Sequence, residues 1–269
     1  MTYLQGPHHF SERRACVVSG VARATVRYQS VTADAAPIRE RLRALALTRP
    51  RFGYRRLTVL LRREYGVVNH KRVYRWYRQD GLQVRRQRRK RVAVTNRVVP
   101  HVPEQAGEQW AMDFMRDTLA NGRSFRTLNV VDACTRECLA IEVDTSLPGL
   151  RVVRVLDRLT AGHGTPHTIR VDNGPEFAGV VLDAWAYTKG VHLDFIEPGK
   201  PTQNGLLESF NGKFRDECLN GHWFRDLPEA RRLIEAWRVD YNEERPHSAL
   251  GNLPPRVFAA QIKRREALS

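Results

Sequence analysis

Residues 108–143 read EQWAMDFMRDTLANGRSFRTLNVVDACTRECLAIEV, and this stretch decides the fold class. Its short runs of β-branched, aromatic and aliphatic residues, separated by polar turns, predict three consecutive strands. We expect these strands at 108–116, 126–132 and 138–143.

After residue 143, the spacing of apolar residues alternates between that of helices and that of strands. A helix is predicted over 150–161, a strand over 168–171, a second helix over 177–189 and a strand over 191–196. A further helix begins near Leu206, after a loop rich in glycine and proline. Three strands followed by helix–strand–helix–strand predict an α/β layer with a mixed sheet.

Three carboxylates are set apart by their places in this pattern. Asp113 falls within the first strand, Asp172 directly follows the fourth, and Glu208 falls in the first turn of the helix near Leu206. Open α/β sheets bind ligands at strand ends, and carboxylate oxygens suit hard cations such as Mg²⁺. Each residue also has a structural explanation: a buried hydrogen-bonded group, a turn former, or a charge favoured by the helix dipole. The placement alone leaves both readings open.

Charge divides the chain into two halves. The chain has 269 residues and a net charge of +16, but residues 1–100 carry 24 basic and 5 acidic side chains, whereas residues 101–269 carry 21 and 24. The first part should therefore seek a polyanion, while the second has an ordinary globular composition.

The helices predicted in the basic half follow the order found in helix-turn-helix DNA-binding proteins. Two short helices are expected within 11–30 around Ser19-Gly20, and two more over 38–46 and 57–61. Another, over 70–79, follows the potential N-cap Asn69. This order predicts an all-α, helix-turn-helix-like region. Its expected DNA contacts are Lys71, Arg72, Arg75 and Arg78.

A cationic run follows this region. Residues 85–91 hold six basic side chains in seven positions and suit a linker lying along phosphates. The expected contacts here are Arg85, Arg86, Arg88, Arg89 and Lys90. A solvated charged face is the alternative, and the sequence leaves open whether residues 35–84 read bases or only phosphates.

Four cysteines are too few for a disulfide framework in a chain of this length, so we expect a reducing cytoplasm. The spacings Cys134-x3-Cys138 and His163-x3-His167 resemble zinc ligands loosely, but no Cys-x2-Cys pair accompanies them. No apolar run suits a membrane span or a signal peptide. Secretion and membrane insertion are therefore not expected.

The C-terminal segment predicts a packed helix. Asp226-Leu227-Pro228-Glu229 suits a capping box with proline at the helix start. One apolar face follows, and we interpret it as core packing; it comprises Leu227, Ala230, Ile234, Trp237 and Tyr241. His247 is expected to be structural or DNA-facing rather than catalytic.

Several motifs together resemble the catalytic core of DDE transposases and retroviral integrases. They are WAMDF at 110–114, DNGPEF at 172–177, PGKP at 198–201 and NGLLESFN at 204–211. Between Asp172 and Glu208 lie 35 residues, the spacing that gives this subgroup its usual name. The C-terminal YNEERPHSALG at 241–251 resembles the signature of bacterial insertion-sequence transposases. With RFGYRR at 51–56 and NHKRVY at 69–74, the chain resembles the second-frame (OrfB) product of the IS-three family.

The resemblance implies an RNase H-like core in which Asp113, Asp172 and Glu208 bind two Mg²⁺ ions, with Mn²⁺ as a possible substitute. It implies strand cleavage by an activated water and then attack of the new 3′-hydroxyl on another phosphodiester. Arg215 fills the basic position seven residues after Glu208, and Lys200 precedes it on the loop; both are expected DNA contacts. Asn173, Asn204 and Lys213 have weaker claims.

The expected partners follow from the same resemblance. They are double-stranded DNA (the element's terminal repeats and its target), a first-frame (OrfA) protein or a frameshift fusion with it, and further copies of this chain on DNA. The zinc-binding N-terminal module of retroviral integrases and a leucine zipper are both missing from the sequence. We expect a cytoplasmic, nucleoid-associated protein without membrane contact.

The sequence thus predicts a metal-dependent DNA transposase. Two other functions stay open: a nuclease of the same fold without joining activity, and a DNA-binding regulator with an inactive core. The expected domains are an N-terminal helical segment at 1–34, the helix-turn-helix-like region at 35–84, a basic linker at 85–104, the catalytic core at 105–222 and a helical extension at 223–269.

Overall fold

A computed structural model describes residues 2–28, 35–84, 103–174, 176–177, 179–196 and 205–266. The chain divides into two compact units, residues 1–41 and residues 42–269, and each is described by itself. Of the sequence-based expectations, the linker over 85–91 and the loop that contains Lys200 and Asn204 lie outside the described residues.

The first unit consists of short helices. They are α1 (Thr2–Gln5), α2 (Glu12–Ser19) and α3 (Arg23–Arg27). The side chain of Ser11 caps the start of α2 by accepting a hydrogen bond from the Arg14 amide, and Gly20 ends the helix in the left-handed conformation. The predicted pair of helices around Ser19-Gly20 is confirmed.

A run of three helices precedes the sheet. These are α4 (Ala36–Thr48), which continues from the first unit into the second, α5 (Tyr54–Tyr65) and α6 (His70–Gln79). The Asn69 side chain caps α6 by accepting from the Lys71 amide at 2.9 Å. Val73 and Tyr77 form its buried stripe, so the predicted helix and its inner face are confirmed.

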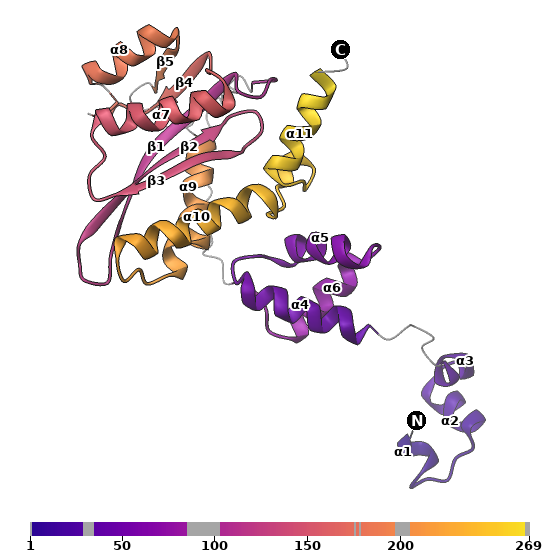
Figure 1. Cartoon of the computed structure of the whole chain (residues 1–269). Coiled ribbons are helices and arrows are strands. Elements are labelled where there is room, and N and C mark those ends of the chain that lie inside the picture. The colour runs from indigo at the N-terminus through magenta and orange to yellow at the C-terminus, as the bar shows by residue number, and fades with distance from the viewer. Residues whose placement is uncertain are drawn as a thin grey trace. The chain divides into compact units, whose positions relative to one another are not determined.

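A five-stranded mixed sheet organises the second unit (Figure 1). Its strands are β1 (Gln109–Thr118), β2 (Ser124–Asp132), β3 (Cys138–Asp144), β4 (Thr168–Val171) and β5 (His192–Phe195). The order is β3-β2-β1-β4-β5; β1, β2 and β3 pair antiparallel, and β1, β4 and β5 pair parallel. The predicted α/β class with a mixed sheet is confirmed.

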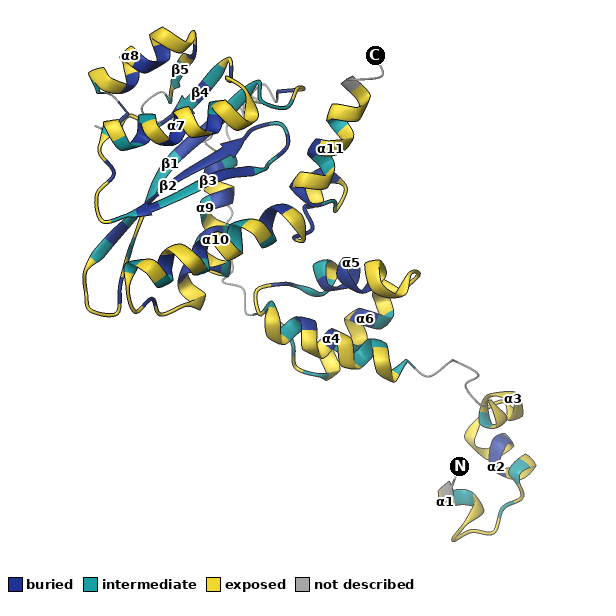
Figure 2. Cartoon of the chain, in the orientation of Figure 1, coloured by how far each residue is buried: buried dark blue, intermediate teal, exposed yellow. Residues whose placement is uncertain are grey.

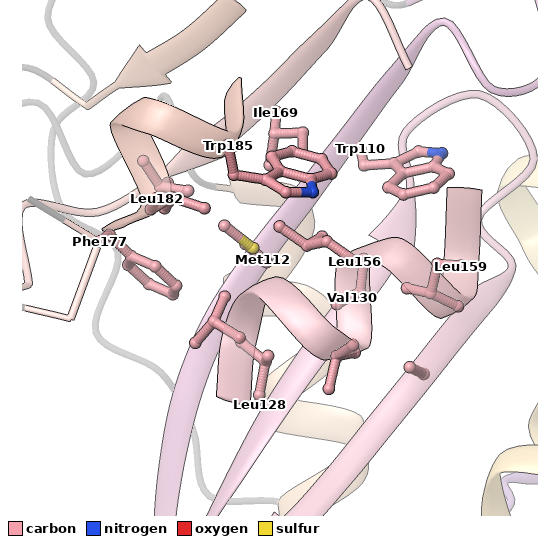
Figure 3. Packing of buried hydrophobic residues seen from close by; sticks show 14 of the residues in the cluster. Trp110, Met112, Leu128, Val130, Leu156, Leu159, Ile169, Phe177, Leu182 and Trp185 are labelled. Atoms are coloured by element: carbon pink, nitrogen blue, oxygen red, sulfur yellow. The ribbon is translucent and has the colours of Figure 1, made fainter. Parts of the chain in front are cut away.

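Side chains alternate across β1 and thereby supply both faces of the sheet. Trp110 and Met112 enter a core cluster with α7 (Gly149–His163) and α8 (Val180–Lys189), where Leu156 and Trp185 meet them (Figure 3). Ala111 enters a second cluster on the opposite face. The position of Asp113 on the strand therefore assigns its side chain to the face opposite Met112.

The opposite face is covered by α9 (Gly205–Glu217) and α10 (Leu227–Glu243). Phe210, Phe214, Ile234 and Tyr241 are buried there, and Figure 2 shows helices with one buried and one exposed side. The short 3-10 turns η2 (Leu219–Gly221) and η3 (Ser248–Leu250) and the helix α11 (Pro255–Glu266) complete the chain.

The structure confirms the cap and the apolar face predicted for the C-terminal helix, but not the position of its proline. The Asp226 side chain accepts from the Glu229 amide at 2.8 Å, and the Glu229 carboxylate in turn accepts from the Arg225 amide. Pro228 lies at the second position of α10 rather than the first. The apolar face of α10 packs into the core as predicted.

Several boundaries differ from the prediction, and two of them bear on the site. Strand β1 extends to Thr118, because Arg116, Asp117 and Thr118 pair with β2 in a hairpin although they are polar. Helix α8 begins at Val180 rather than Phe177, because the Phe177 ring stacks on Phe114 of β1. Within the described ranges, no helix is long and apolar enough to cross a membrane.

Candidate active site

Asp113 lies in the middle of β1, half-buried against α9. Its carboxylate accepts from the Phe114 amide at 2.7 Å and from the Asn211 side-chain amide at 2.7 Å. Asn211 belongs to α9, so one helix–strand contact fixes the orientation of this carboxylate.

A second side-chain amide, that of Asn129, supports Asn211 in turn. Asn129 is the β2 residue directly opposite Asp113 in the hairpin register, and its side chain is fully buried. Its side-chain amide donates to the Asn211 carbonyl oxygen at 2.8 Å. Asn211 therefore donates to Asp113 and accepts from Asn129, which fixes the direction of its own amide.

Asp172 directly follows β4, the parallel neighbour of β1. Its Oδ1 accepts from the Gly174 amide at 3.0 Å, which forms a tight turn. The Asn173 side chain instead donates to the Ile196 carbonyl oxygen at 2.8 Å and ties this turn to the end of β5. This placement at a strand end agrees with the sequence-based expectation.

Glu208 lies in the first turn of α9, one turn before Asn211, and is exposed. Burial raises the pKa of Asp113 to about 6, and the negative charges of Asp172 and then Glu208 add to this effect. The charges of Asp172 and Glu208 thus act on Asp113, so the three predicted carboxylates are coupled electrostatically.

This donor set fits a hard divalent cation by its chemistry, because all three residues offer carboxylate oxygens. In the ranges that the structure describes, no three His, Cys, Asp or Glu side chains are arranged to hold a metal ion. Another acidic residue nearby, Asp132, is occupied elsewhere: its carboxylate accepts from the amides of Gly107, Cys134 and Thr135.

The predicted DNA-contact residues divide into two groups. On α6, Lys71, Arg75 and Arg78 are exposed, whereas Arg72 lies over the Trp76 ring at 4.8 Å. Arg215 donates to the Arg116 carbonyl oxygen of β1 at 3.1 Å, so it braces α9 against the sheet. The remaining predicted contacts, Lys200 and the arginines and lysine of 85–90, lie outside the described residues.

Lys213, which the sequence suggested as a neighbour of the carboxylates, forms its side-chain hydrogen bond within α9. Its ammonium group donates to the Ser209 hydroxyl at 2.9 Å. Burial, together with the positive charges of Arg245 and Arg56, lowers its pKa to about 8.

The C-terminal signature is structural in this fold. Arg245 is buried and donates to both oxygens of Glu217 on α9 at 2.7 Å. Asn242 exchanges two hydrogen bonds with the backbone of Cys138 on β3, each 2.8 Å long. His247 is buried edge-on against Tyr241, and burial lowers its pKa to about 3. These contacts fasten α9 and α10 under the sheet.

Sequence reasoning assigned no role to Asn129, Asn211 or Arg126. Asn211 lies within a quoted motif, three residues after Glu208, and that helical spacing is a signal that could have identified it. Asn129 and Arg126 could not be found in this way, because strand register places Asn129 opposite Asp113 and a contact across 50 residues joins Arg126 to Glu176.

Comparisons with known proteins agree with this geometry. Models of an integrase core domain match residues 103–201 and 189–255, and a model of an HTH-like domain matches residues 33–91. A 31.7 kDa protein of insertion element IS407 from Burkholderia multivorans, described as uncharacterized, is 49% identical over 97% of this chain and 95% of its own length. Transposase InsD of insertion element IS2 from Escherichia coli is 30% identical over 79% of this chain and 74% of its own length.

A solved structure supports the fold. A chain of the simian T-cell lymphotropic virus intasome, determined in complex with the PP2A regulatory subunit B56 gamma, superimposes with a TM-score of 0.54 at 15% identity. The match covers 81% of this chain and 73% of that chain. The core thus has the RNase H-like fold of integrases.

Proposed function

Because this chain belongs to the IS-three family of insertion-element DDE transposases, we propose that Asp113, Asp172 and Glu208 are the carboxylates with which it cleaves and joins DNA. The family makes it a polynucleotidyl transferase that binds DNA and assembles on it as an oligomer. The observation that carries the assignment is the strand register: β1 and β4 pair parallel with Ala111 opposite Arg170, which sets Asp172 beside Asp113. The raised pKa of Asp113, caused by burial and by the charges of Asp172 and Glu208, supports it.

Divalent metal is the general cofactor of this family, and we propose Mg²⁺, bound as two ions by these three residues, with Mn²⁺ as a substitute. When bound, such ions activate the attacking oxygen and stabilise the leaving oxygen at phosphorus. The all-oxygen donor set supports this choice. Since Glu208 is exposed at the start of α9, we expect it to complete the site only when ion and DNA are present.

The protein's own residues supply orientation. The Phe114 amide and the Asn211 side chain each hold one carboxylate oxygen of Asp113, and the Gly174 amide holds one oxygen of Asp172. Arg215 lies two helical turns from Glu208, where it can meet a phosphate while it braces β1. The cations of α6 and of residues 85–90 would hold the DNA further from the chemistry.

The proposal extends to the domains of the chain and to its partners. We propose the division into a helical segment at 1–34, a DNA-binding region at 35–84, a linker at 85–104, a catalytic core at 105–222 and an extension at 223–269. An OrfA protein, or a frameshift fusion with it, would supply recognition of the terminal repeats. Association with the nucleoid follows if the basic half binds DNA without strong sequence preference.

The amide variants Asp113→Asn, Asp172→Asn and Glu208→Gln test the site. Each should abolish metal-dependent cleavage and joining and leave DNA affinity almost intact, because these residues bind metal and not phosphate. Asp183→Asn, at an exposed acidic position on α8, is the matched control and should stay active.

The rival functions predict other outcomes of this experiment. Cleavage without joined product in the wild type would favour the nuclease. DNA binding without any metal-dependent product would favour the regulator with an inactive core. Full activity in one amide variant would remove that residue from the site.

A further inference from the structure

Arg126 and Glu176, we propose, form a clasp that positions the loop carrying Asp172 next to Asp113. The inference rests on the proposed function, since it concerns the same site. Both are positioning residues, because neither is proposed to touch metal or DNA. The clasp joins the start of β2 to the segment that follows β4.

The ion pair spans 50 residues of sequence. Arg126 donates from Nη1 to Glu176 Oε1, and both side chains are largely buried, at 32% and 21% exposure. The Arg126 guanidinium also lies over the Phe114 ring, 4.5 Å from its centroid. A cation that is stacked on an aromatic face and paired with a carboxylate has little freedom to turn elsewhere.

Aromatic packing continues the clasp on the same side of the sheet. Phe114 directly follows Asp113 on β1, and its ring stacks on the fully buried Phe177 with centroids 4.8 Å apart. The Phe177 amide donates to the Gly174 carbonyl oxygen at 2.9 Å. Glu176 and Phe177 therefore hold the loop to the hairpin at two points: Glu176 pairs with Arg126 of β2, and Phe177 stacks on Phe114 of β1.

Gly174 shows why the loop needs this support. A Cβ at this position would lie 3.0 Å from Asp172 Oδ1 and 3.4 Å from Glu176 Oε2, so both carboxylates face Gly174. Like charges on one short loop repel each other. The hydrogen bond from Arg126 holds the pKa of Glu176 below its usual value, so Glu176 stays ionised and bound to Arg126.

The test uses the full chain and three measurements. Arg126→Met removes the charge but keeps an apolar stem over Phe114, and Glu176→Ala breaks the same pair from the other side. The measurements are backbone hydrogen exchange over 172–177 without metal, the single-turnover joining rate with magnesium, and the affinity for DNA. The control is Arg158→Met, which breaks one of the two ion pairs of Glu142 on the edge strand β3.

Both clasp variants should exchange the loop amides several-fold faster while the central strands stay protected. Their joining rate should fall about 10–100-fold, the usual loss when a partner of a metal ligand is removed. DNA affinity should not change, and Arg126→Lys should recover part of the rate and of the protection. Arg158→Met should leave all three measurements as in the wild type.

Other results would overturn the clasp. Unchanged exchange over 172–177 in both variants would mean that the pair does not hold the loop. A fall in DNA affinity that matches the fall in rate for Arg126→Met, but is missing in Glu176→Ala, would make Arg126 a direct phosphate contact. Hydrogen exchange needs no activity, so a wild type without joining would count against the proposed function and leave the clasp decided by the exchange data.

Discussion

Asp113 accepts two hydrogen bonds, which by themselves favour the ionised carboxylate, yet its pKa is raised to about 6. Burial and the neighbouring Asp172 therefore outweigh both hydrogen bonds. At the scale of single residues, the site is destabilised in the metal-free protein, and this electrostatic strain is what a bound cation would relieve.

The pH dependence of stability follows from this pKa. A carboxyl group whose pKa is higher in the folded than in the unfolded chain destabilises the fold at high pH, and the loss is relieved as pH falls from about 6 toward 4. Asp113→Asn should therefore stabilise the metal-free protein by up to about 3 kcal/mol at pH 8. Near pH 4 the variant and the wild type should be alike.

Urea unfolding in EDTA between pH 4 and pH 8 measures this difference. Asp117→Asn, at the end of the same strand, serves as the control and should show no comparable gain. Equal stability of Asp113→Asn and wild type at pH 8 would show that the carboxylates do not repel each other in the folded chain.

Asn211 gives a second prediction at this scale. Asn211→Leu removes the donor to Asp113 Oδ2 and leaves Asn129 without its acceptor. The joining rate should fall about 10–100-fold, since such partners of metal ligands are worth that much. Asn211→Asp should be no better, because it places a further carboxylate beside Asp113.

Single-turnover joining at saturating DNA gives this rate, with DNA affinity measured in parallel. Asn220→Leu, at an exposed position in the turn after α9, is the control for the change of residue type. A wild-type rate in Asn211→Leu would show that Asp113 is oriented without the helix.

At the scale of elements, α9 carries Glu208 in its first turn and is held at its end by a buried ion pair between Glu217 and Arg245. Arg245 is 1% exposed and pairs with Glu217, nine residues after Glu208 on the same helix. Removing one partner of a buried pair costs up to about 3–5 kcal/mol, although Glu217 keeps a second contact with Arg56 at 3.1 Å. Arg245→Met should therefore lower the free energy of unfolding by up to that amount.

Chemical denaturation of three variants checks this element. Arg225→Met breaks an exposed pair with Glu229 and should cost far less, because water screens both charges. The double variant Arg245→Met with Glu217→Met should recover part of the loss, because no charge stays buried alone. A loss for Arg245→Met no larger than for Arg225→Met would contradict the structural role of the C-terminal signature.

Elements with clear end signals were predictable from the sequence. Strand β4 has its predicted bounds, since Pro166 precedes it and Asp172-Asn173-Gly174 turns the chain after it. The start of α8 was wrong because a tertiary contact, the stacking of Phe177 on Phe114, overrides local helix periodicity. The placement of Asp172 at a strand end and of Glu208 in a first helical turn was likewise readable from periodicity.

The partners of these carboxylates were not predictable in the same way. Asn129 meets Asp113 through hairpin register, Asn211 meets it across 98 residues, and Arg126 meets Glu176 across 50 residues. Such contacts depend on how strands and helices pack, which a local pattern does not encode. The motifs thus indicate the ligands, and only the fold identifies what orients them.

At the scale of the whole molecule, the basic half predicts steep salt dependence of DNA binding. Each phosphate contact contributes about 0.9 to the slope of log affinity against log salt. Changing Lys71, Arg75 and Arg78 to alanine together should lower that slope by up to about 3, if each of these exposed side chains meets a phosphate.

Filter binding or fluorescence anisotropy over a salt series gives the slope for the full chain. The matched control is the triple change of Arg154, Arg158 and Lys189 to alanine, which removes the same charge from α7 and α8. Equal slopes in wild type and the α6 variant would move the DNA contacts away from this helix.

The most direct test of the transposase assignment is a strand-transfer assay with labelled terminal-repeat DNA and magnesium. The full chain is compared with Glu208→Gln, each alone and with the upstream-frame protein or fusion. We predict joined product from the wild type and none from Glu208→Gln, although both bind the DNA. Joined product from Glu208→Gln at the wild-type rate would contradict the carboxylate site on which this account depends.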